Sequence, residues 1–518
     1  MTGTLSADRQ ILVVGAGPAG LATAITAIRN GARALVVERH AGTSIYPRAT
    51  GVHLRTVELL RGWGLHREVR ELDVRVRPLR SVSPTLREAT PLPLGYPTDP
   101  RDVLAVSPVL PVCCPQDRLE PVLLQHLRTL GGEVRFGVEL IDLVDHGTGI
   151  TATLRDRDTG ALSTVRARFV VGADGTRSAV RGMAGIPVER IGEAGEFVYL
   201  LFTANLDAML GDDRRFGMYV VTHPDAAGVI VRAGGHHRWA MARQWFPERG
   251  ESPADFTPDR CIDLIRTAAG DPALDVQLLT RMPFTMAAEL ATTFRAGNAF
   301  LVGDAAHRMT PAGALGMNTA IQSAHNLGWK LAWVARGWAG EALLDSYHAE
   351  RRPAGERNAH RSLEMRDVPP QAGEWTVDLD RRYASDVIAP AGPHPDGVLP
   401  GRRAPHVWVS AGGRRRSLLD LFDGRLTLVV GPDADAWRAA AAAAPVPLQV
   451  LGTSRELVCD AGRLARRYGL AHGGAVLVRP DGHVAWRCTR AVEPVVQLLA
   501  AINLTLGRVG DQALAASA

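Results

Sequence analysis

The chain has 518 residues, 46% hydrophobic and 22% charged, a composition typical of a soluble globular protein with roughly three domains. Its 59 basic and 54 acidic residues give a net charge of +5, which is too small to indicate nucleic-acid binding. No run of about 18 apolar residues predicts a membrane-spanning helix, and the N-terminus lacks the pattern of a secretory signal.

The N-terminal segment ILVVGAGPAGLATAITAIRNGARALVVE, residues 11–38, predicts a βαβ unit. Apolar runs at 11–14 and 34–37 indicate two buried strands. A glycine-rich turn follows the first strand, and residues 21–29 have helical composition. The order of strand, turn, helix and strand is that of a dinucleotide-binding unit.

Three glycines of this unit have Gly-x-Gly-x-x-Gly spacing. Gly15 permits the tight turn, Gly17 lets the backbone approach a pyrophosphate, and Gly20 lets the helix pack on the strand. The helix N-terminus offers unpaired N–H groups to phosphates. Glu38 lies where an acid can accept hydrogen bonds from a ribose. The unit therefore predicts nucleotide binding, with a merely structural tight turn as the alternative.

The next part of the chain continues this α/β pattern. Residues 71–100 alternate and contain several prolines, which indicates short strands or a hairpin outside the main sheet. The other expected elements are helices at 52–63 and 116–130 and strands at 133–136, 150–154 and 165–171.

Residues 190–290 change character, because strand-like segments separated by turn signals dominate them. We expect a mixed or antiparallel sheet here, with strands at 197–204, 218–221, 228–233 and 239–245 and a helix at 259–269. The α/β pattern then returns with a strand at 299–302 and helices at 317–336 and 345–360.

Prolines and glycines at 366–405 predict a linker. An independent α/β module is expected after it, with strands at 426–430 and 447–452 around a helix at 434–444. It ends in a hairpin of strands 475–478 and 483–487 across Pro480, Asp481 and Gly482.

Five cysteines are present, and none has Cys-x-x-Cys spacing: Cys113, Cys114, Cys261, Cys459 and Cys488. The adjacent pair has poor geometry for an ordinary disulfide or a zinc site. We therefore expect a cytoplasmic protein without a metal centre.

Two further motifs follow predicted strands: GADGTRS at 172–178 and GDAAH at 303–307. Asp174 can either hold a turn by bonding its own backbone or anchor a pyrophosphate, with Arg177 and Arg181 attracting phosphate. Asp304 can bind a sugar-like hydroxyl. The segment after it leads into a helix whose first N–H groups can face an anion or an electron-rich ring edge.

Taken in this order, the three motifs resemble the class A, single-component FAD-dependent aromatic monooxygenases, of the para-hydroxybenzoate hydroxylase and phenol hydroxylase type. The resemblance covers about residues 8–355 and points to the polyketide hydroxylase-like branch. It implies a Rossmann-like FAD-binding domain of the glutathione reductase type, an inserted mixed-sheet substrate domain and a C-terminal thioredoxin-like domain. That last domain lacks Cys-x-x-Cys, so we expect it to serve packing or dimerisation and not thiol chemistry.

The resemblance also implies site residues and domain limits. Asp304 would bind the ribitol of noncovalent FAD, and Arg48 and Pro311 would act at the flavin. The implied cofactor residues are Gly15, Gly17, Pro18, Ala19, Gly20, Glu38, Arg39, Arg48, Gln116, Asp174, Asp304, Pro311, Gly316, Met317 and Asn318. The expected domains are FAD-binding at 1–75, 101–185 and 282–365, substrate-binding at 76–100 and 186–281, a linker at 366–398 and thioredoxin-like at 399–518.

Two positions depart from the family pattern. Gly313 is followed by Ala314, where many members have paired glycines, and Ser323 stands where many polyketide-acting members have Asp. The second departure concerns a polar contact of the helix and not FAD binding.

The implied reaction uses NADPH or NADH and dioxygen to hydroxylate a phenolic or polycyclic aromatic substrate through a flavin hydroperoxide. Baeyer–Villiger insertion and epoxidation use the same machinery and remain open, as do a non-oxygenating flavin reductase and an FAD-binding protein. We expect a monomer or homodimer without nucleic-acid or membrane partners. Substrate contacts are proposed at Tyr219, Arg232, Trp239 and Phe284, and a pocket base among His223, His236, His237, Tyr219 and Arg232.

Overall fold

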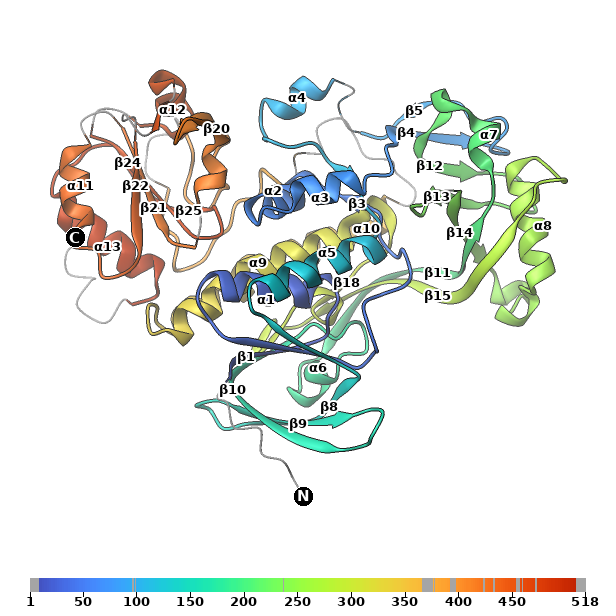
Figure 1. The fold of residues 1–518 in the computed structure, drawn as a ribbon, viewed down its shortest axis with the longest axis horizontal. Coiled ribbons are helices and arrows are strands. Elements are labelled where there is room, and N and C mark those ends of the chain that lie inside the picture. The colour runs from blue at the N-terminus through green and yellow to red at the C-terminus, as the bar shows by residue number, and fades with distance from the viewer. Residues whose placement is uncertain are drawn as a thin grey trace.

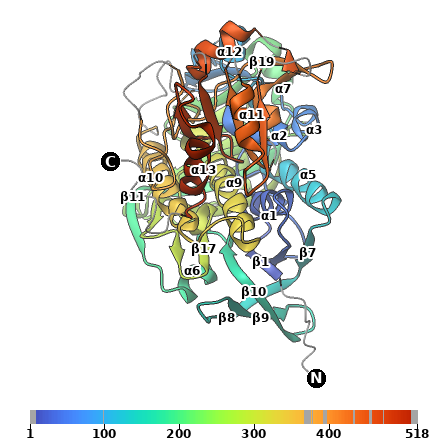
Figure 2. The ribbon, with the colours of Figure 1, turned by 90° about the vertical axis from the view of Figure 1, so that its left-hand side faces the viewer.

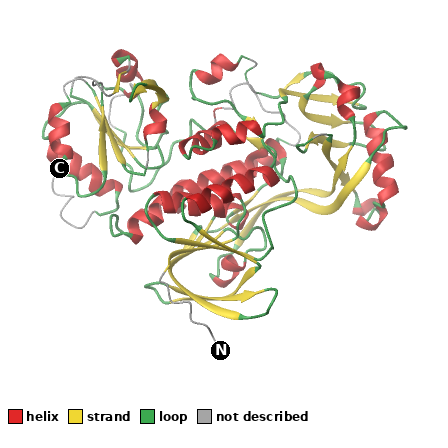
Figure 3. Cartoon of the chain, viewed as in Figure 1, coloured by secondary structure: helices red, strands yellow, loops and turns green. Residues whose placement is uncertain are grey.

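The computed structural model describes residues 9–508 except 96, 98, 236, 366–375, 377, 392–396, 423, 432–433, 453–456, 459 and 471–472. Figure 1 shows a central α/β body, a second sheet domain on the right and the C-terminal domain on the left. Figure 3 separates the same parts into helices and sheets, with long helices running across the centre.

The central body is built on a sheet in the order β16-β17-β10-β1-β2-β7, extended by β8 and β9. The strands β17, β10, β1, β2 and β7 run parallel to one another. The strand bounds are β1 Arg9–Val14, β2 Ala34–Glu38, β7 Glu133–Phe136, β8 Val138–Asp145, β9 Ile150–Asp156, β10 Leu162–Gly172, β16 Arg295–Ala296 and β17 Ala299–Leu301. Ile11, Leu12 and Val13 are completely buried, as consecutive apolar residues are when layers cover both faces of a parallel strand.

Helices pack on this sheet and on one another. Their bounds are α1 Pro18–Arg29, α5 Gln116–Thr129, α9 Leu315–Ala335 and α10 Ala342–Glu364. Helix α9 lies very close to α1, because a β-carbon on Gly328 would stand only 2.7 Å from the β-carbon of Thr26. Smaller elements complete this body: β3 Gly51–Val52, α2 Leu54–Gly62, α3 His66–Glu71, α4 Pro100–Leu104, β6 Val112–Cys113 and α6 Ala179–Met183.

The second sheet has the order β18-β15-β11-β14-β13-β12-β4-β5 and is mostly antiparallel, with β12 and β4 as its parallel pair. Helix α8, Pro258–Ala269, covers one face and forms a separate hydrophobic core with it. The strands are β4 Arg77–Ser83, β5 Leu92–Pro93, β11 Val188–Thr203, β12 Phe216–Val221, β13 Gly228–Arg232, β14 Arg238–Trp245, β15 Gln277–Ala291 and β18 His307–Arg308; helix α7 is Leu206–Leu210.

The opposite face of this sheet is turned toward the central body. Tyr199 lies on β11 and donates a hydrogen bond from its hydroxyl to the carbonyl oxygen of Pro47, at 3.2 Å. Its neighbours Val198 and Leu200 belong to the core on the α8 side, because successive side chains of a strand point to opposite faces.

The C-terminal domain contains a sheet in the order β22-β21-β24-β25 and a smaller one in the order β20-β19-β23. Strands β21 and β22 are parallel and β24–β25 is an antiparallel hairpin, as expected for a thioredoxin-like domain. Figure 2 shows α11 and α13 on the viewer's side of this domain. The elements are β19 Trp408–Ala411, β20 Arg414–Ser417, β21 Leu426–Val430, α11 Asp435–Ala441, β22 Leu448–Leu451, β23 Leu457–Val458, α12 Ala461–Tyr468, β24 Ala475–Val478, β25 Val484–Cys488 and α13 Pro494–Thr505.

Most expected elements are present, and the differences have physical reasons. Helix α13 was not expected, because its apolar residues surround the helix and leave no amphipathic period to detect. The expected domain limit at 281/282 falls inside the single strand β15. The described part of the expected linker is packed against the protein, since its side chains Leu379, Tyr383 and Val387 are each at most 5% exposed. Residues 366–375 of that linker lie outside the described residues.

Burial holds four histidines in the neutral form. It lowers the pKa of His307 and His325 to about 3, and the pKa of His406 and His483 to about 4. Unfolding returns each ring to its ordinary pKa of 6.5. Between the folded and unfolded pKa values the unfolded chain binds more protons, so the free energy of unfolding decreases as the pH falls below about 6.5.

We therefore predict that the protein loses stability between about pH 7.5 and pH 5.5, by about 1 kcal/mol for each of these histidines. Thermal unfolding over this range measures the effect. The variant His325→Gln should show a shallower dependence on pH than the parent chain, because one depressed titration is removed. A melting temperature that stays constant over this range contradicts the prediction.

Candidate functional site

Three glycine-containing turns meet at the carboxyl ends of neighbouring parallel strands. They follow β1, β10 and β17, which are adjacent in the central sheet. The N–H of Ala173 donates to the carbonyl of Val14 at 2.8 Å, and the N–H of Val302 donates to Gly172 at 2.9 Å. The guanidinium of Arg181 joins the second turn to the third by donating to the carbonyl of Ala305 at 3.0 Å. In open α/β sheets, ligands bind at such an edge.

The first turn combines two crowded glycines with an open one. Gly15 has φ +108°, and a β-carbon there would stand 2.3 Å from the carbonyl oxygen of Ala173. A β-carbon on Gly20 would stand 1.9 Å from the carbonyl oxygen of Gly15. Gly17, just before Pro18 and Ala19 at the start of α1, would meet nothing within 4 Å. The turn therefore packs tightly against Ala173 and leaves open space in front of the N-terminus of α1. This arrangement fits the approach of a phosphate.

The carboxylate of Glu38 connects the ends of β1 and β2. Its Oε2 accepts a hydrogen bond from the N–H of Ala16 at 2.9 Å, and its Oε1 accepts one from the N–H of His40 at 2.9 Å. The ring of His40 lies 2.5 Å from the same Oε1. Glu38 is therefore fixed beside the glycine turn, while the next residue, Arg39, is exposed.

Asp174 uses its carboxylate inside its own turn. It accepts hydrogen bonds from the hydroxyl of Ser178 at 2.5 Å and from the N–H groups of Ala179 and Val180 at 2.7 and 3.2 Å. Burial raises the pKa of Asp174, and these bonds oppose the shift. The geometry thus favours the turn-holding alternative for this residue, and its contact with a cofactor stays a prediction.

Asp304 differs from Asp174 because its side chain is exposed. Surrounding protein nevertheless raises the pKa of its carboxyl by desolvation, against the opposing effect of Arg308 and Arg48. No residue in the described part of the chain donates a hydrogen bond to the Asp304 carboxylate. Asp304 is therefore available to a ligand hydroxyl, and we call the open space that Asp304 and Gly17 border the cleft.

The loop that leads into α9 follows Asp304 in the chain and is also open to solvent in part. Pro311 is exposed, and Gly313 and Ala314 both have left-handed backbones, with φ of +74° and +53°. Ala314 therefore holds a conformation that costs a residue with a β-carbon roughly 1 kcal/mol. A β-carbon on Gly316 would meet nothing within 4 Å, so the first turn of α9 faces open space. Met317 is 7% exposed.

The side chain of Asn318 is completely buried and forms hydrogen bonds within the protein. Its Oδ1 accepts from the N–H of His53 at 2.8 Å, and its Nδ2 donates to the carbonyls of Gly51 and Ala314 at 2.9 and 2.7 Å. These bonds hold the start of α9 against β3. Asn318 could therefore contact a cofactor through its backbone, but its amide side chain is already occupied.

Arg48 and Gln116 come from two other segments, the loop before β3 and the start of α5. Arg48 is exposed and acts on the Asp304 carboxyl, whose pKa it lowers. Gln116 donates from its backbone to the carbonyl of Ala49 at 2.7 Å and from its side chain to Glu120 at 2.7 Å. Glu120 also accepts from the N–H of Ser44 at 2.6 Å, so it holds the loop that carries Arg48. Sequence reasoning missed Glu120, although it lies one helical turn after Gln116.

The structure corrects part of the expected substrate contacts. Trp239 and Tyr219 are 0% and 1% exposed in the core on the α8 side, where the Tyr219 hydroxyl donates to the carbonyl of Arg214 at 2.5 Å. Arg232 stacks on Trp239 at 4.4 Å and is ion-paired with Asp207. These three side chains face away from Tyr199, because strand residues alternate between faces.

Phe284 lies on the face that carries Tyr199. It is paired across the strands with Phe197, and the two ring centroids are 5.7 Å apart. Among the candidate bases, His223 and His237 lie 4.0 and 3.7 Å from Asp225 and Asp207, and His236 lies outside the described residues. No group of metal-ligating side chains occurs among the residues described, nor is any helix in that part long and apolar enough to span a membrane.

Comparison with known proteins adds to this geometry. Residues 8–362 match the family "FAD binding domain" and residues 397–508 match "Aromatic-ring hydroxylase, C-terminal". An aklavinone 12-hydroxylase of Streptomyces purpurascens is 36% identical over 97% of this chain and 99% of its own. A tetracenomycin A2 monooxygenase-dioxygenase of Streptomyces glaucescens is 36% identical over 96% and 97%. A crystal structure of aklavinone-11 hydroxylase with FAD and aklavinone has a TM-score of 0.88 at 34% identity, over 98% of this chain and all of that one.

The first turn contains an open glycine, Gly17, and a crowded one, Gly20, and replacing each in turn gives a matched test of FAD binding at this turn. Gly17→Val adds atoms to open space and should change the stability of the cofactor-free chain by at most about 0.5 kcal/mol, while FAD affinity falls roughly tenfold or more. Gly20→Val meets backbone atoms and should destabilise the fold by about 1–3 kcal/mol. Thermal unfolding and FAD titration measure both variants. Unchanged FAD affinity in Gly17→Val would contradict the assignment of this turn.

Proposed function

Because the chain belongs to the family of FAD-dependent aromatic-ring hydroxylases, we propose that it inserts one oxygen atom of dioxygen into a phenolic, polycyclic substrate of the polyketide type. The protein is an FAD-dependent monooxygenase. The balanced reaction takes the aromatic substrate, dioxygen, a reduced nicotinamide and a proton to the hydroxylated product, water and the oxidised nicotinamide. The observation that carries the proposal is the exposed carboxylate of Asp304, which accepts no hydrogen bond from the described residues and lies beside the open glycine turn.

The residues of the cleft fit FAD in both charge and space. The N-terminus of α1, with Gly17 in front of it, would receive the pyrophosphate, and Glu38 would accept from the ribose. Asp304 would bind a ribitol hydroxyl, and the loop from Pro311 to the first turn of α9 would border the flavin ring. Bound FAD would supply the redox chemistry, namely acceptance of electrons from the nicotinamide and activation of dioxygen.

The chain itself would orient the reactants and exclude water. The N–H groups at the start of α9 would stabilise negative charge at the ring edge, because a helix N-terminus carries a positive partial charge. Arg48, exposed in the same cleft, would add a fixed positive charge there. The face of the second sheet that carries Phe284, Phe197 and Tyr199 would receive the substrate, since flat aromatic groups pack well against apolar strand residues.

Further features of the proposal come from the sequence. NADPH or NADH would be the electron donor, and it would visit the cleft transiently. The described cysteines are free thiols, in agreement with a reducing cytoplasm as the place of action: Cys113, Cys114, Cys261 and Cys488. The protein would act as a monomer or homodimer.

The deciding experiment measures NADPH and dioxygen consumption with a panel of phenols and polycyclic quinones. We expect substrate-stimulated consumption of both and a product heavier by one oxygen atom. Product structure separates hydroxylation from Baeyer–Villiger insertion and epoxidation. Consumption of NADPH without dioxygen would identify a flavin reductase, and no turnover with bound FAD would identify a binding protein. Either result contradicts the proposal.

The ribitol assignment predicts that Asp304→Asn weakens FAD binding about 10- to 100-fold, since a hydrogen bond to a charged group contributes about 1.5–3 kcal/mol. Fluorescence titration of the cofactor-free protein with FAD measures this change. Asp345→Asn is the matched control. Asp345 lies on α10, is exposed and forms an ion pair with Arg295. Equal affinities for the parent chain and Asp304→Asn would show that Asp304 does not bind the cofactor.

A further inference from the structure

Helix α9 carries a row of buried polar side chains at four-residue spacing. They are Asn318, Gln322, Asn326 and Lys330, each at most 7% exposed. Residues four apart lie on the same side of a helix, so the row forms one stripe along α9. It begins at the turn proposed to face the flavin and continues toward the C-terminal domain. Each of these polar groups needs a partner, because burial without one is costly.

The C-terminal domain supplies partners through a hairpin turn that is itself buried. Residues 479–483 join β24 to β25, and Arg479, Asp481 and His483 are 0%, 2% and 7% exposed. Hairpin turns normally lie on the surface, because their backbone groups and charges need water. This turn is instead inserted against α2, α9 and α10, where the guanidinium of Arg55 donates to the carbonyl of Asp481 at 2.7 Å.

Four charged side chains meet at this point and balance one another. Arg479 donates two hydrogen bonds to Glu350 of α10, at 2.6 and 2.8 Å, and two to Asp481, at 3.1 and 2.5 Å. Lys330 donates to Glu350 at 2.8 Å. Asn326 donates to both Glu350 and Asp481, at 2.7 and 3.2 Å. Two members of the stripe are therefore tied, directly or through Glu350, to the C-terminal hairpin.

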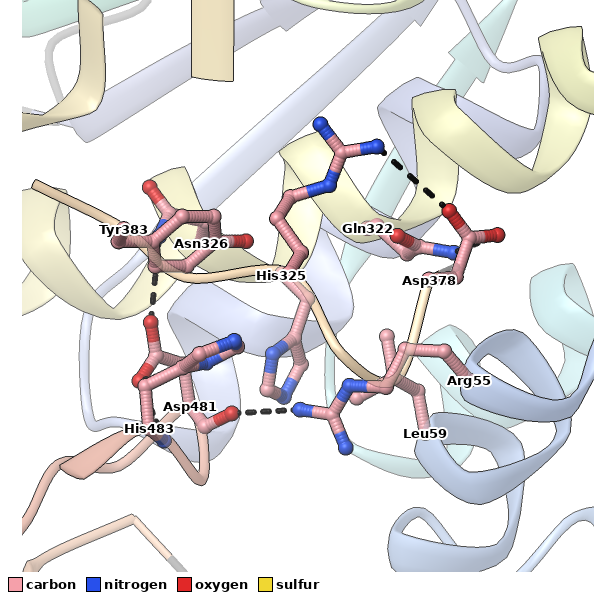
Figure 4. A pocket seen from close by; sticks show the side chains of 10 residues that line it. Arg55, Leu59, Gln322, His325, Asn326, Asp378, Tyr383, Asp481 and His483 are labelled. Atoms are coloured by element: carbon pink, nitrogen blue, oxygen red, sulfur yellow. Dashed lines mark hydrogen bonds and ion pairs between the residues drawn. The ribbon is translucent and has the colours of Figure 1, made fainter. Parts of the chain in front are cut away.

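A second connection lies closer to the flavin end of α9. Asp378 accepts from Gln322 at 3.3 Å and lies 3.5 Å from the ring of His53, whose backbone N–H bonds Asn318. Figure 4 shows Gln322, Asp378, Asn326 and Asp481 around a cavity of about 10 Å³, which is the size of a single water molecule. Groups from late in the chain thus hold Gln322 and Asn326 directly, while Asn318 is linked to Asp378 through His53 and Lys330 is linked to Arg479 through Glu350.

We propose that Arg479 and Asp481 of the C-terminal domain are positioning residues, which hold α9 so that its N-terminus meets the flavin in the reactive geometry. The inference rests on the proposed function, because it takes the start of α9 to border the flavin. It assigns the C-terminal domain a role in the active site of its own chain, in place of the packing or dimerisation role expected from sequence. Any movement that separates the members of a buried ion cluster leaves an unpaired buried charge, which is strongly destabilising. The hairpin and α9 are therefore held in one arrangement.

The test removes the hairpin's part of the cluster without leaving an unpaired charge. In Arg479→Met/Asp481→Asn, the Lys330–Glu350 pair remains and the site stays neutral. We expect FAD to bind about 10-fold more weakly, consistent with a coupling between sites of about 1–2 kcal/mol. We also expect a shifted absorption spectrum of the bound flavin and less product for each NADPH consumed. A purely structural role would not change the flavin spectrum.

Arg61→Met/Asp420→Asn is the matched control. Arg61 of α2 makes a two-bond ion pair with Asp420 of the C-terminal domain, at 2.7 and 2.8 Å, and no bond of this pair to α9 occurs among the described residues. The control also replaces one arginine and one aspartate, and it removes a neutral pair that joins the two domains away from the buried cluster. It should change FAD affinity less than about 2-fold and leave the flavin spectrum unchanged. Equal effects of the two double variants would overturn the proposal, because domain docking alone would then explain both.

Asn326→Ala keeps the proposal testable if the double variant does not fold. This change removes the direct bond of α9 to Asp481 and one of its two bonds to Glu350, while Lys330 still pairs with Glu350 and all four charges remain. It should produce the same changes in flavin spectrum and product yield to a smaller degree, and unchanged values would overturn the proposal. Failure of the proposed function is recognised separately, because the parent chain would then not bind FAD or not oxygenate any substrate.

Discussion

The cleft depends on the parallel pairing of β1 with β10 and of β10 with β17. This pairing brings three turns that are far apart in the sequence to one edge of one sheet. The close approach of Gly15 to Ala173 is possible only without a β-carbon, and it brings the second turn up against the first. The turns are crowded against each other, while the position in front of Gly17 stays open to a bound dinucleotide.

Buried charges position the C-terminal domain, as close backbone packing positions the three turns. A buried ion cluster contributes little net stability, since desolvation of the ions offsets their attraction. It does select one arrangement, because any other leaves the buried carboxylate of Glu350 or Asp481 without its cationic partner. The cluster joins the consecutive helices α9 and α10 to the β24–β25 turn, which comes from a much later part of the chain. The position of one domain is in this way specified by side chains of another.

Much of the fold could be predicted from local pattern. The apolar runs of β1 and β2, the helical spacing of α5 and the strand-like segments of the second sheet all have clear periods, and they occur where expected. Helix α13 escaped prediction because it is apolar on all sides. Strand β11 is longer than expected and β15 was not expected, because their pairing with each other continues beyond the segments with strong strand propensity. Such lengthening depends on a partner far away in the sequence.

The site shows the same division. The sequence by itself determined the glycine turn, the acids that follow the strands and the resemblance to flavin monooxygenases, because each is a short motif whose spacing reflects local backbone geometry. Only the tertiary structure decided which acids are free. Asp174 is used within its own turn, Asp304 remains accessible, and the side chains of Trp239 and Phe284 point to opposite faces of one sheet. It also decided that the turn at Asp481 is buried. The reason is that distant segments packing together decide which side chains are exposed, which face of a sheet they occupy and which groups they bond. No local pattern contains that information.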